Sequence, residues 1–158
     1  MGEWSPLDPP APPEGPRGPR LLAVDLGLRT GLAVFERRDA GVRLLRYRSQ
    51  NYGSPARLKR GAFAEVSAEA PLEALVVEGD TQLARAWTQP AARRGARVRV
   101  CQAHDWRPAL LLPRERERGA VAKRSADGLA RAIIDASGAP KPTALRHDAA
   151  EAICIGWW

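Results

Sequence analysis

The apolar and polar positions of the chain change their period several times, and the order of these changes predicts the fold. Residues 21–27 (LLAVDLG) form an apolar run of strand length. Residues 30–36 (TGLAVFE) follow after a tight glycine-containing turn, which is typical of a β-hairpin. Residues 41–50 (GVRLLRYRSQ) alternate well enough for a third strand. These three segments predict a meander of three strands at the start of the domain.

After this meander, helix and strand patterns alternate. A turn rich in Gly, Ser and Pro leads into a predicted helix over roughly 56–70. Residues 72–79 (LEALVVEG) form an apolar run with little alternation, as expected of a strand that is covered on both faces. Residues 96–102 (ARVRVCQ) predict a fifth strand. Asp80 can cap a helix that fills the segment between these two strands, with Pro90 as a candidate break.

The last third of the chain is predicted to be helical. It contains a short helical segment near 105–112, a loop of basic and acidic residues (PRERERG), a helix over about 120–137 and a last helix from about 146. The whole order predicts an α/β domain with a mixed five-stranded sheet and helices on both faces. Residues 1–20 hold seven of the fourteen prolines, so we expect a disordered, polyproline-II-like arm before a domain that begins at Leu21.

The composition bounds the functions that the chain can have. With 158 residues, of which 44% are hydrophobic, the chain can form one domain with a core of its own. Its formal net charge is +7, and 22 of its 25 basic residues are arginine, which suits bidentate contacts with phosphate and indicates a polyanionic partner. Genome composition can explain the arginine bias, but it does not explain the net charge.

Cysteine usage and hydropathy indicate the compartment. Cys101 and Cys154 lie far apart without the spacing of a metal site, so they are expected to be reduced core residues. No apolar run approaches the roughly 18 residues of a membrane-spanning helix. The first residues lack the basic and apolar segments of an export signal. We therefore expect a cytoplasmic protein without a membrane partner.

Four carboxylates lie on apolar elements of the chain. Asp25 closes the first strand (AVD) and Glu78 closes the fourth (VVE), near strand ends, where mixed α/β sheets usually have their sites. Asp148 and Glu151 are three positions apart, which puts both on one face of a helix among Ala and Ile residues. Carboxylates in such surroundings are costly to desolvate, and neighbouring like charges repel one another unless a cation lies between them.

Each of these carboxylates also has a structural explanation. Asp25 can cap the turn that follows it, Glu78 can pair with an arginine, and Asp148 can be a helix N-cap. Taken together they are better explained by divalent metal, because Mg²⁺ prefers oxygen ligands and, in pairs about 4 Å apart, holds both oxygens of a phosphoryl displacement. The pattern therefore predicts a metal site.

These motifs resemble those of the RuvC-type Holliday-junction resolvases, which belong to the RNase H-like (retroviral integrase) superfamily. The resemblance covers nearly everything from Leu21 to Trp158 and rests on AVDLGLRTGLAVF, LVVEG and HDAAEAICIG, with HDWRPALLL and VAKRSADGLARAII between them. It implies an RNase H-like fold and a homodimer that cuts two strands of a four-way DNA junction symmetrically. It also implies a cofactor of two Mg²⁺ ions, which Mn²⁺ can replace. The metal ligands implied by the resemblance are Asp25, Glu78, Asp148 and Glu151, with Lys123 as a cation that contacts phosphate or stabilises the transition state.

Further residues are expected to contact nucleic acid or the partner subunit. Tryptophans can stack on unpaired bases, although most are simply packed. The basic run near the last helices can contact the DNA backbone or form a solvated loop. The expected nucleic-acid contacts are Arg29, Trp87, Trp106, Arg107, Arg114, Arg116, Arg118 and Arg124. The resemblance implies a dimer interface on the helix after Glu78, with Leu83, Ala84, Ala86 and Trp87. His147 can carry a proton or act in the outer sphere of the metal, and Asp80 is expected to be a helix cap.

The leading hypothesis is a Mg²⁺-dependent, structure-selective endonuclease acting on branched DNA. A related family that trims ribosomal RNA precursors shares the DxG hairpin, but its second motif usually lacks a glutamate that closes a VVE strand. An actin-like sugar kinase or ATPase also begins DxGxxxTG but needs two such domains, for which 158 residues are too few. A catalytically inactive nucleic-acid-binding relative is the remaining alternative, favoured only if Glu151 fails to hold metal.

Overall fold

A mixed five-stranded sheet forms the centre of the molecule. The computed structural model describes residues 17–39 and 41–158. The strands are β1 (Arg20–Asp25), β2 (Arg29–Arg38), β3 (Gly41–Asn51), β4 (Leu72–Glu78) and β5 (Arg97–Cys101). Their order in the sheet is β3-β2-β1-β4-β5, with β1–β2 and β2–β3 antiparallel and with β1–β4 and β4–β5 parallel. The predicted meander and the predicted mixed sheet are both confirmed.

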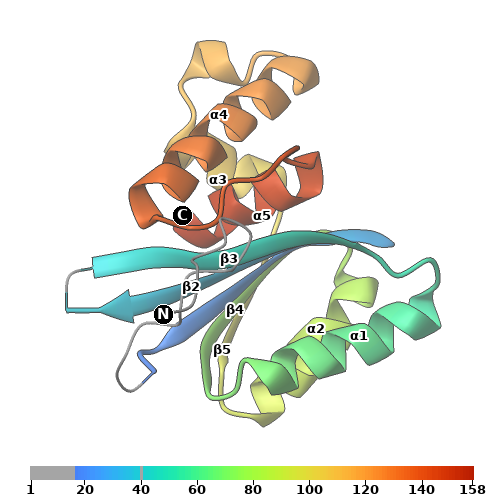
Figure 1. Ribbon diagram of the computed structural model, residues 1–158. Helices are drawn as coiled ribbons and strands as arrows, with labels where there is room; N and C mark the ends of the chain where they lie inside the picture. Colours follow the sequence, from blue (N-terminus) through green and yellow to red (C-terminus); the bar gives the residue numbers. More distant parts are fainter. Residues whose placement is uncertain (1–16, 40) are drawn as a thin grey trace.

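Helices cover both faces of this sheet (Figure 1). The helices α1 (Pro55–Ala68) and α2 (Thr81–Arg93) pack together on one face. The other face carries α3 (Ala103–Leu110), α4 (Gly119–Ser137) and α5 (His147–Trp157), with α5 lying directly on β1 and β2. A short 3₁₀ turn, Pro113–Glu115, begins the predicted PRERERG loop.

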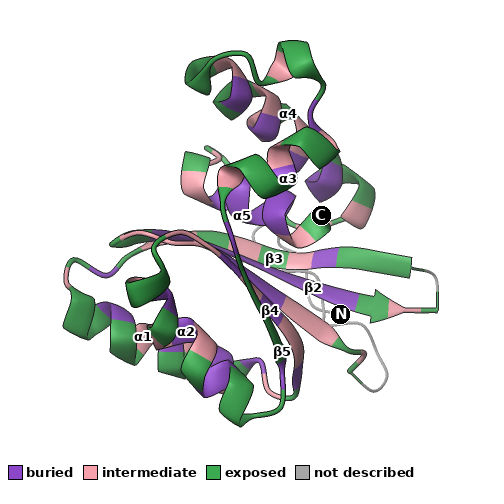
Figure 2. Ribbon diagram, turned by 180° about the vertical axis from the view of Figure 1, so that it is seen from behind, coloured by how far each residue is buried: buried purple, intermediate pink, exposed green. Residues whose placement is uncertain are grey.

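The two-residue period of β1 separates two cores, which are the buried parts of the ribbon in Figure 2. Leu22 and Val24 pack into the core beneath α1 and α2, whereas Ala23 packs into the core beneath α4 and α5. Successive side chains of a strand point to opposite faces. Asp25 therefore follows Ala23 and points toward the face that α5 covers.

The start of the domain differs from the prediction in detail. The predicted arm falls largely on residues 1–16, which lie outside the described residues. The first strand begins at Arg20, and the carbonyl of Pro19 before it accepts a hydrogen bond from the amide of Arg37 in β2 at 2.9 Å.

The predicted break of α2 at Pro90 is wrong, because α2 continues to Arg93. Pro90 lies in the last turn of the helix and is buried against the core, where its ring adds apolar contact.

The two cysteines lie in the interior, as predicted. Cys101 and Cys154 are buried, and both are free thiols. Burial raises the pKa of each thiol to about 12, so neither is a nucleophile at neutral pH. None of the helices within 17–39 and 41–158 has the length and apolar character needed to cross a membrane.

Candidate metal centre

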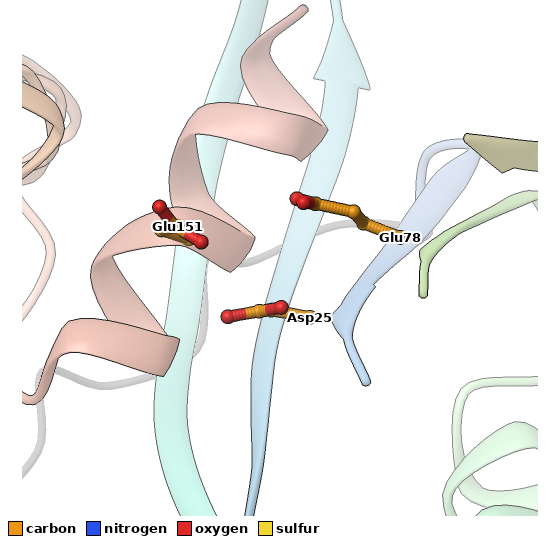
Figure 3. Close-up of side chains that lie close together, drawn as sticks. All are labelled: Asp25, Glu78 and Glu151. Atoms are coloured by element: carbon orange, nitrogen blue, oxygen red, sulfur yellow. The ribbon is translucent and has the colours of Figure 1, made fainter. Parts of the chain in front are cut away.

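Three carboxylates from three different elements converge at one edge of the sheet. Asp25 and Glu78 are the last residues of β1 and β4, and they are paired in the parallel register of these strands. Glu151 lies in the first half of α5. Figure 3 shows Asp25 and Glu78 reaching from the neighbouring strands toward α5, which carries Glu151. One oxygen of each carboxylate lies within 4.8 Å of the others, which is a spacing that one cation can bridge.

Two glycines allow α5 to approach the sheet closely enough to form this cluster. Gly31 faces Asp25 across the antiparallel pair β1–β2. A Cβ atom at Gly31 would overlap the backbone carbonyl of Asp148, and one at Gly156 would overlap the ring of Phe35. Gly31 lies in β2, beneath the first turn of α5.

The electrostatics of the cluster favour a bound cation. Burial, reinforced by the neighbouring carboxylates of Glu151, Glu78 and Asp148, raises the pKa of Asp25 to about 8. Burial also raises the pKa of Glu78, although a hydrogen bond from Trp106 opposes this effect. Acids that are costly to ionise together are stabilised by a divalent ion, and carboxylate oxygens are the ligands that Mg²⁺ and Mn²⁺ prefer. The donor set therefore fits such an ion.

The fourth predicted ligand, Asp148, is turned toward a different partner. Its Oδ2 accepts a hydrogen bond from the Ser49 hydroxyl at 2.6 Å, and its Oδ1 accepts one from the amide of Ala149 at 2.9 Å. Its carboxylate is outside the cluster of three, although its charge contributes to the raised pKa of Asp25. Ser49 was not among the predicted residues, and no local pattern around it signals this contact.

A basic residue from α3 enters the site. The Arg107 guanidinium donates a hydrogen bond to Glu151 Oε1 at 2.6 Å, and its side chain is 23% exposed. His147 lies one turn before Glu151 on α5, with its Nε2 3.6 Å from the same oxygen. In the structure Arg107 is an ion-pair partner within the acidic cluster, and its expected contact with the nucleic-acid backbone stays a prediction. The predicted cation Lys123 is exposed near the start of α4, and its role stays a prediction.

The structure corrects the expectation that Trp87 and Trp106 stack on bases. Both side chains are fully buried, so neither ring has a face that a base could reach. Trp106 Nε1 donates a hydrogen bond to Glu78 Oε2 at 2.8 Å. Trp87 lies in the core on the other face of the sheet, edge-to-face with Tyr52 at a centroid distance of 6.3 Å.

The helix α2 is organised by its own cap and core. Asp80 accepts hydrogen bonds from the amides of Gln82 and Leu83, which confirms its predicted role as the N-cap. Ala84 and Trp87 are buried inside the protein, so they are corrected from interface residues to core residues. The remaining basic residues that were expected to contact nucleic acid are exposed: Arg29, Arg114, Arg116, Arg118 and Arg124.

Comparison with solved structures supports this fold, whereas comparison with family models and curated proteins finds no match. No family model matches the chain, and no curated protein matches it. A structure of RuvC from T. thermophilus in complex with a Holliday junction substrate is 21% identical, has a TM-score of 0.57, and covers 87% of this chain and 90% of its own. Another Thermus thermophilus RuvC structure is 22% identical, with a TM-score of 0.59 and the same coverage.

A more distant neighbour has the same architecture. The yeast mitochondrial Holliday junction resolvase Ydc2 is 11% identical, has a TM-score of 0.56, and covers 90% of this chain and 80% of its own. The predicted RNase H-like fold, in the form found in these resolvases, is thereby confirmed.

Proposed function

We propose that this protein is a metal-dependent endonuclease that cuts branched DNA in the manner of a Holliday-junction resolvase. The observation that carries the proposal is the convergence of Asp25, Glu78 and Glu151 to within 4.8 Å, in a fold shared with RuvC and Ydc2. Acidic clusters at the carboxyl ends of neighbouring strands are a common place for catalysis in α/β sheets. The proposed cofactor is Mg²⁺, which Mn²⁺ can replace.

The chain's own residues have separate roles in this mechanism. Two divalent ions held by the carboxylates would supply an activated water and would neutralise charge on the phosphate. Asp25 is central to the cluster, since all three of the other acids act on its pKa. Arg107 fixes Glu151 through one oxygen, and Asp148 is the proposed fourth ligand at the start of the same helix. Arg107 and the exposed Lys123 are the candidates for neutralising charge on the scissile phosphate.

The charge of the chain supports a nucleic-acid substrate. The formal net charge is +7, and the exposed arginines lie at the start of β2, in the loop before α4 and on α4 itself. Lysine and arginine side chains that neutralise phosphates supply much of the affinity for DNA.

A homodimer is part of the proposal, because two symmetric nicks require two sites related by a two-fold axis. Leu83 and Ala86 are the residues of the predicted interface that are only partly covered by the protein's own core.

The test compares three substrates and three proteins. Labelled four-way junction, linear duplex and precursor ribosomal RNA are incubated with Mg²⁺ and wild type, Asp25→Asn or Asp80→Asn. We expect symmetric nicks in the junction, lost in Asp25→Asn while junction binding persists. Asp80→Asn is the matched control, because Asp80 caps α2 and is not one of the three clustered acids, and asparagine caps a helix about equally well. Activity that survives Asp25→Asn, or equal cleavage of all substrates, contradicts the proposal.

A catalytically inactive nucleic-acid-binding relative is the second candidate. The observation in its favour is the Arg107–Glu151 ion pair, in which the chain supplies a cation of its own. This candidate predicts tight junction binding without cleavage at any Mg²⁺ or Mn²⁺ concentration. Cleavage of the RNA precursor alone would instead favour the RNA-trimming alternative.

A further inference from the structure

We propose that Trp106 is a positioning residue of the metal centre, whose buried indole N–H holds Glu78 in the orientation that a divalent cation needs. This inference rests on the proposed function to the extent that the cluster binds such a cation. Trp106 is fully buried, and its Nε1 lies 2.8 Å from Glu78 Oε2. Trp106 was expected to stack on bases, which its burial excludes.

The start of α3 is fixed to the end of β4 by contacts that do not involve Trp106. Gln102 Nε2 donates to the carbonyl of Gly79 at 3.0 Å, and the amide of Gly79 donates to the carbonyl of Cys101 at 3.2 Å. Asp105 Oδ2 accepts a hydrogen bond from the Gln102 amide at 2.7 Å, which closes the first turn of α3. Because Gly79 directly follows Glu78, these contacts hold the indole in place beside the carboxylate.

The Trp106 indole N–H is a neutral donor, and this preserves the negative charge of Glu78 that a metal ion needs. Arg107 orients Glu151 but also cancels its charge, whereas an indole N–H orients Glu78 and leaves the full carboxylate charge available to a cation. Without this hydrogen bond, repulsion from Glu151 would favour rotation of the Glu78 side chain away from the cluster. Groups that orient metal ligands in this way typically change metal affinity by about 10- to 100-fold.

Trp87 provides a matched control within the same chain. It is also fully buried, but its Nε1 has no hydrogen-bond partner among the described residues. Replacement of either tryptophan by phenylalanine removes a similar amount of buried ring. Only Trp106→Phe removes a hydrogen bond to a proposed metal ligand.

The experiment measures cation binding in the absence of DNA. Mn²⁺ is titrated into wild type, Trp106→Phe, Trp87→Phe and Asp25→Asn, and free Mn²⁺ is followed by electron paramagnetic resonance. We expect Trp106→Phe to raise the Kd about tenfold or more, Trp87→Phe to leave it unchanged, and Asp25→Asn to abolish binding. Equal Kd values for wild type and Trp106→Phe, or equal losses in the two tryptophan variants, overturn the inference.

A second measurement does not depend on a folded variant. In ¹⁵N-labelled wild-type protein with assigned indole signals, Mg²⁺ should shift the Trp106 Nε1–H resonance and leave that of Trp87 in place. A Trp106 signal that does not respond to saturating Mg²⁺ overturns the inference. If the wild type binds Mn²⁺ normally but Trp106→Phe also does, only the role of Trp106 fails. If the wild type binds no Mn²⁺, the metal centre of the proposed function fails as well.

Discussion

Replacing Asp25 by asparagine should stabilise the metal-free protein, and increasingly so as the pH rises. Burial, together with Glu151, Glu78 and Asp148, raises the pKa of Asp25 from 3.8 to about 8 in the folded chain. The folded state therefore binds more protons than the unfolded state between these two values, and the stability that Asp25 contributes falls as the pH rises through this range. Asparagine has nearly the same shape and does not ionise.

The expected size follows from the change in pKa. Each step of one in pKa corresponds to about 1.4 kcal/mol, so a change from 3.8 to about 8 corresponds to about 6 kcal/mol. Asp25 is mostly buried, so solvent screening reduces this figure only slightly. The difference in the free energy of unfolding between Asp25→Asn and wild type should be near zero below pH 4. It should grow by about 1.4 kcal/mol per pH unit and level off above about pH 8.

Urea unfolding at pH 4 to 9 in the presence of EDTA measures this difference. Asp80→Asn is the control, since it changes an exposed helix cap and should show no comparable rise with pH. Mg²⁺ should stabilise the wild type at pH 8 and leave Asp25→Asn unaffected, because a ligand stabilises only the state that binds it. A difference that does not depend on pH, or a less stable Asp25→Asn at pH 8 in EDTA, would refute the reasoning.

Further substitutions test the surroundings of the cluster. Gly31→Ala should cost about 2 kcal/mol and weaken Mn²⁺ binding, because its Cβ would overlap the carbonyl of Asp148; unchanged stability in urea would contradict this. Gly128→Ala, in the interior of α4 with open space around it, should instead stabilise the protein by about 0.5–1 kcal/mol, and a loss would contradict the packing described. Arg107→Gln should cost about 3 kcal/mol in EDTA, because it leaves a buried carboxylate without its partner, and Mg²⁺ should restore more stability to this variant than to wild type. Glu36 is buried, but a backbone N–H and neighbouring arginines outweigh burial and hold its pKa below the usual value. Its contribution is therefore present above about pH 4.5 and lost as the pH falls through the lowered pKa, so the gap between wild type and Glu36→Gln in urea should close in acid; a gap that widens in acid would contradict this.

The sequence by itself determined the order of the elements and named all three clustered acids, although it did not separate Glu151 from Asp148, which lies outside the cluster. The two-residue period of the strands and the apolar runs at β1 and β4 place Asp25 and Glu78 at strand ends, and parallel pairing of these strands puts both ends at the same edge. These signals are local and depend on neighbouring residues in the chain. The same kind of signal predicted a break at Pro90 that does not occur, because the helix there is supported by tertiary packing.

The tertiary structure alone decided which side chains complete and surround the cluster. Trp106 and Glu78 form a hydrogen bond although 28 positions separate them in the sequence. The separation is 44 positions for the hydrogen bond between Arg107 and Glu151, and 99 for the one between Ser49 and Asp148. These contacts depend on how α3 and α5 pack on the sheet and on which rotamer each side chain then adopts. A pattern along the chain predicts that a residue is polar or apolar, but not which distant group it contacts. For this reason Trp106 and Arg107 could be singled out from the sequence, while their partners appeared only in the fold.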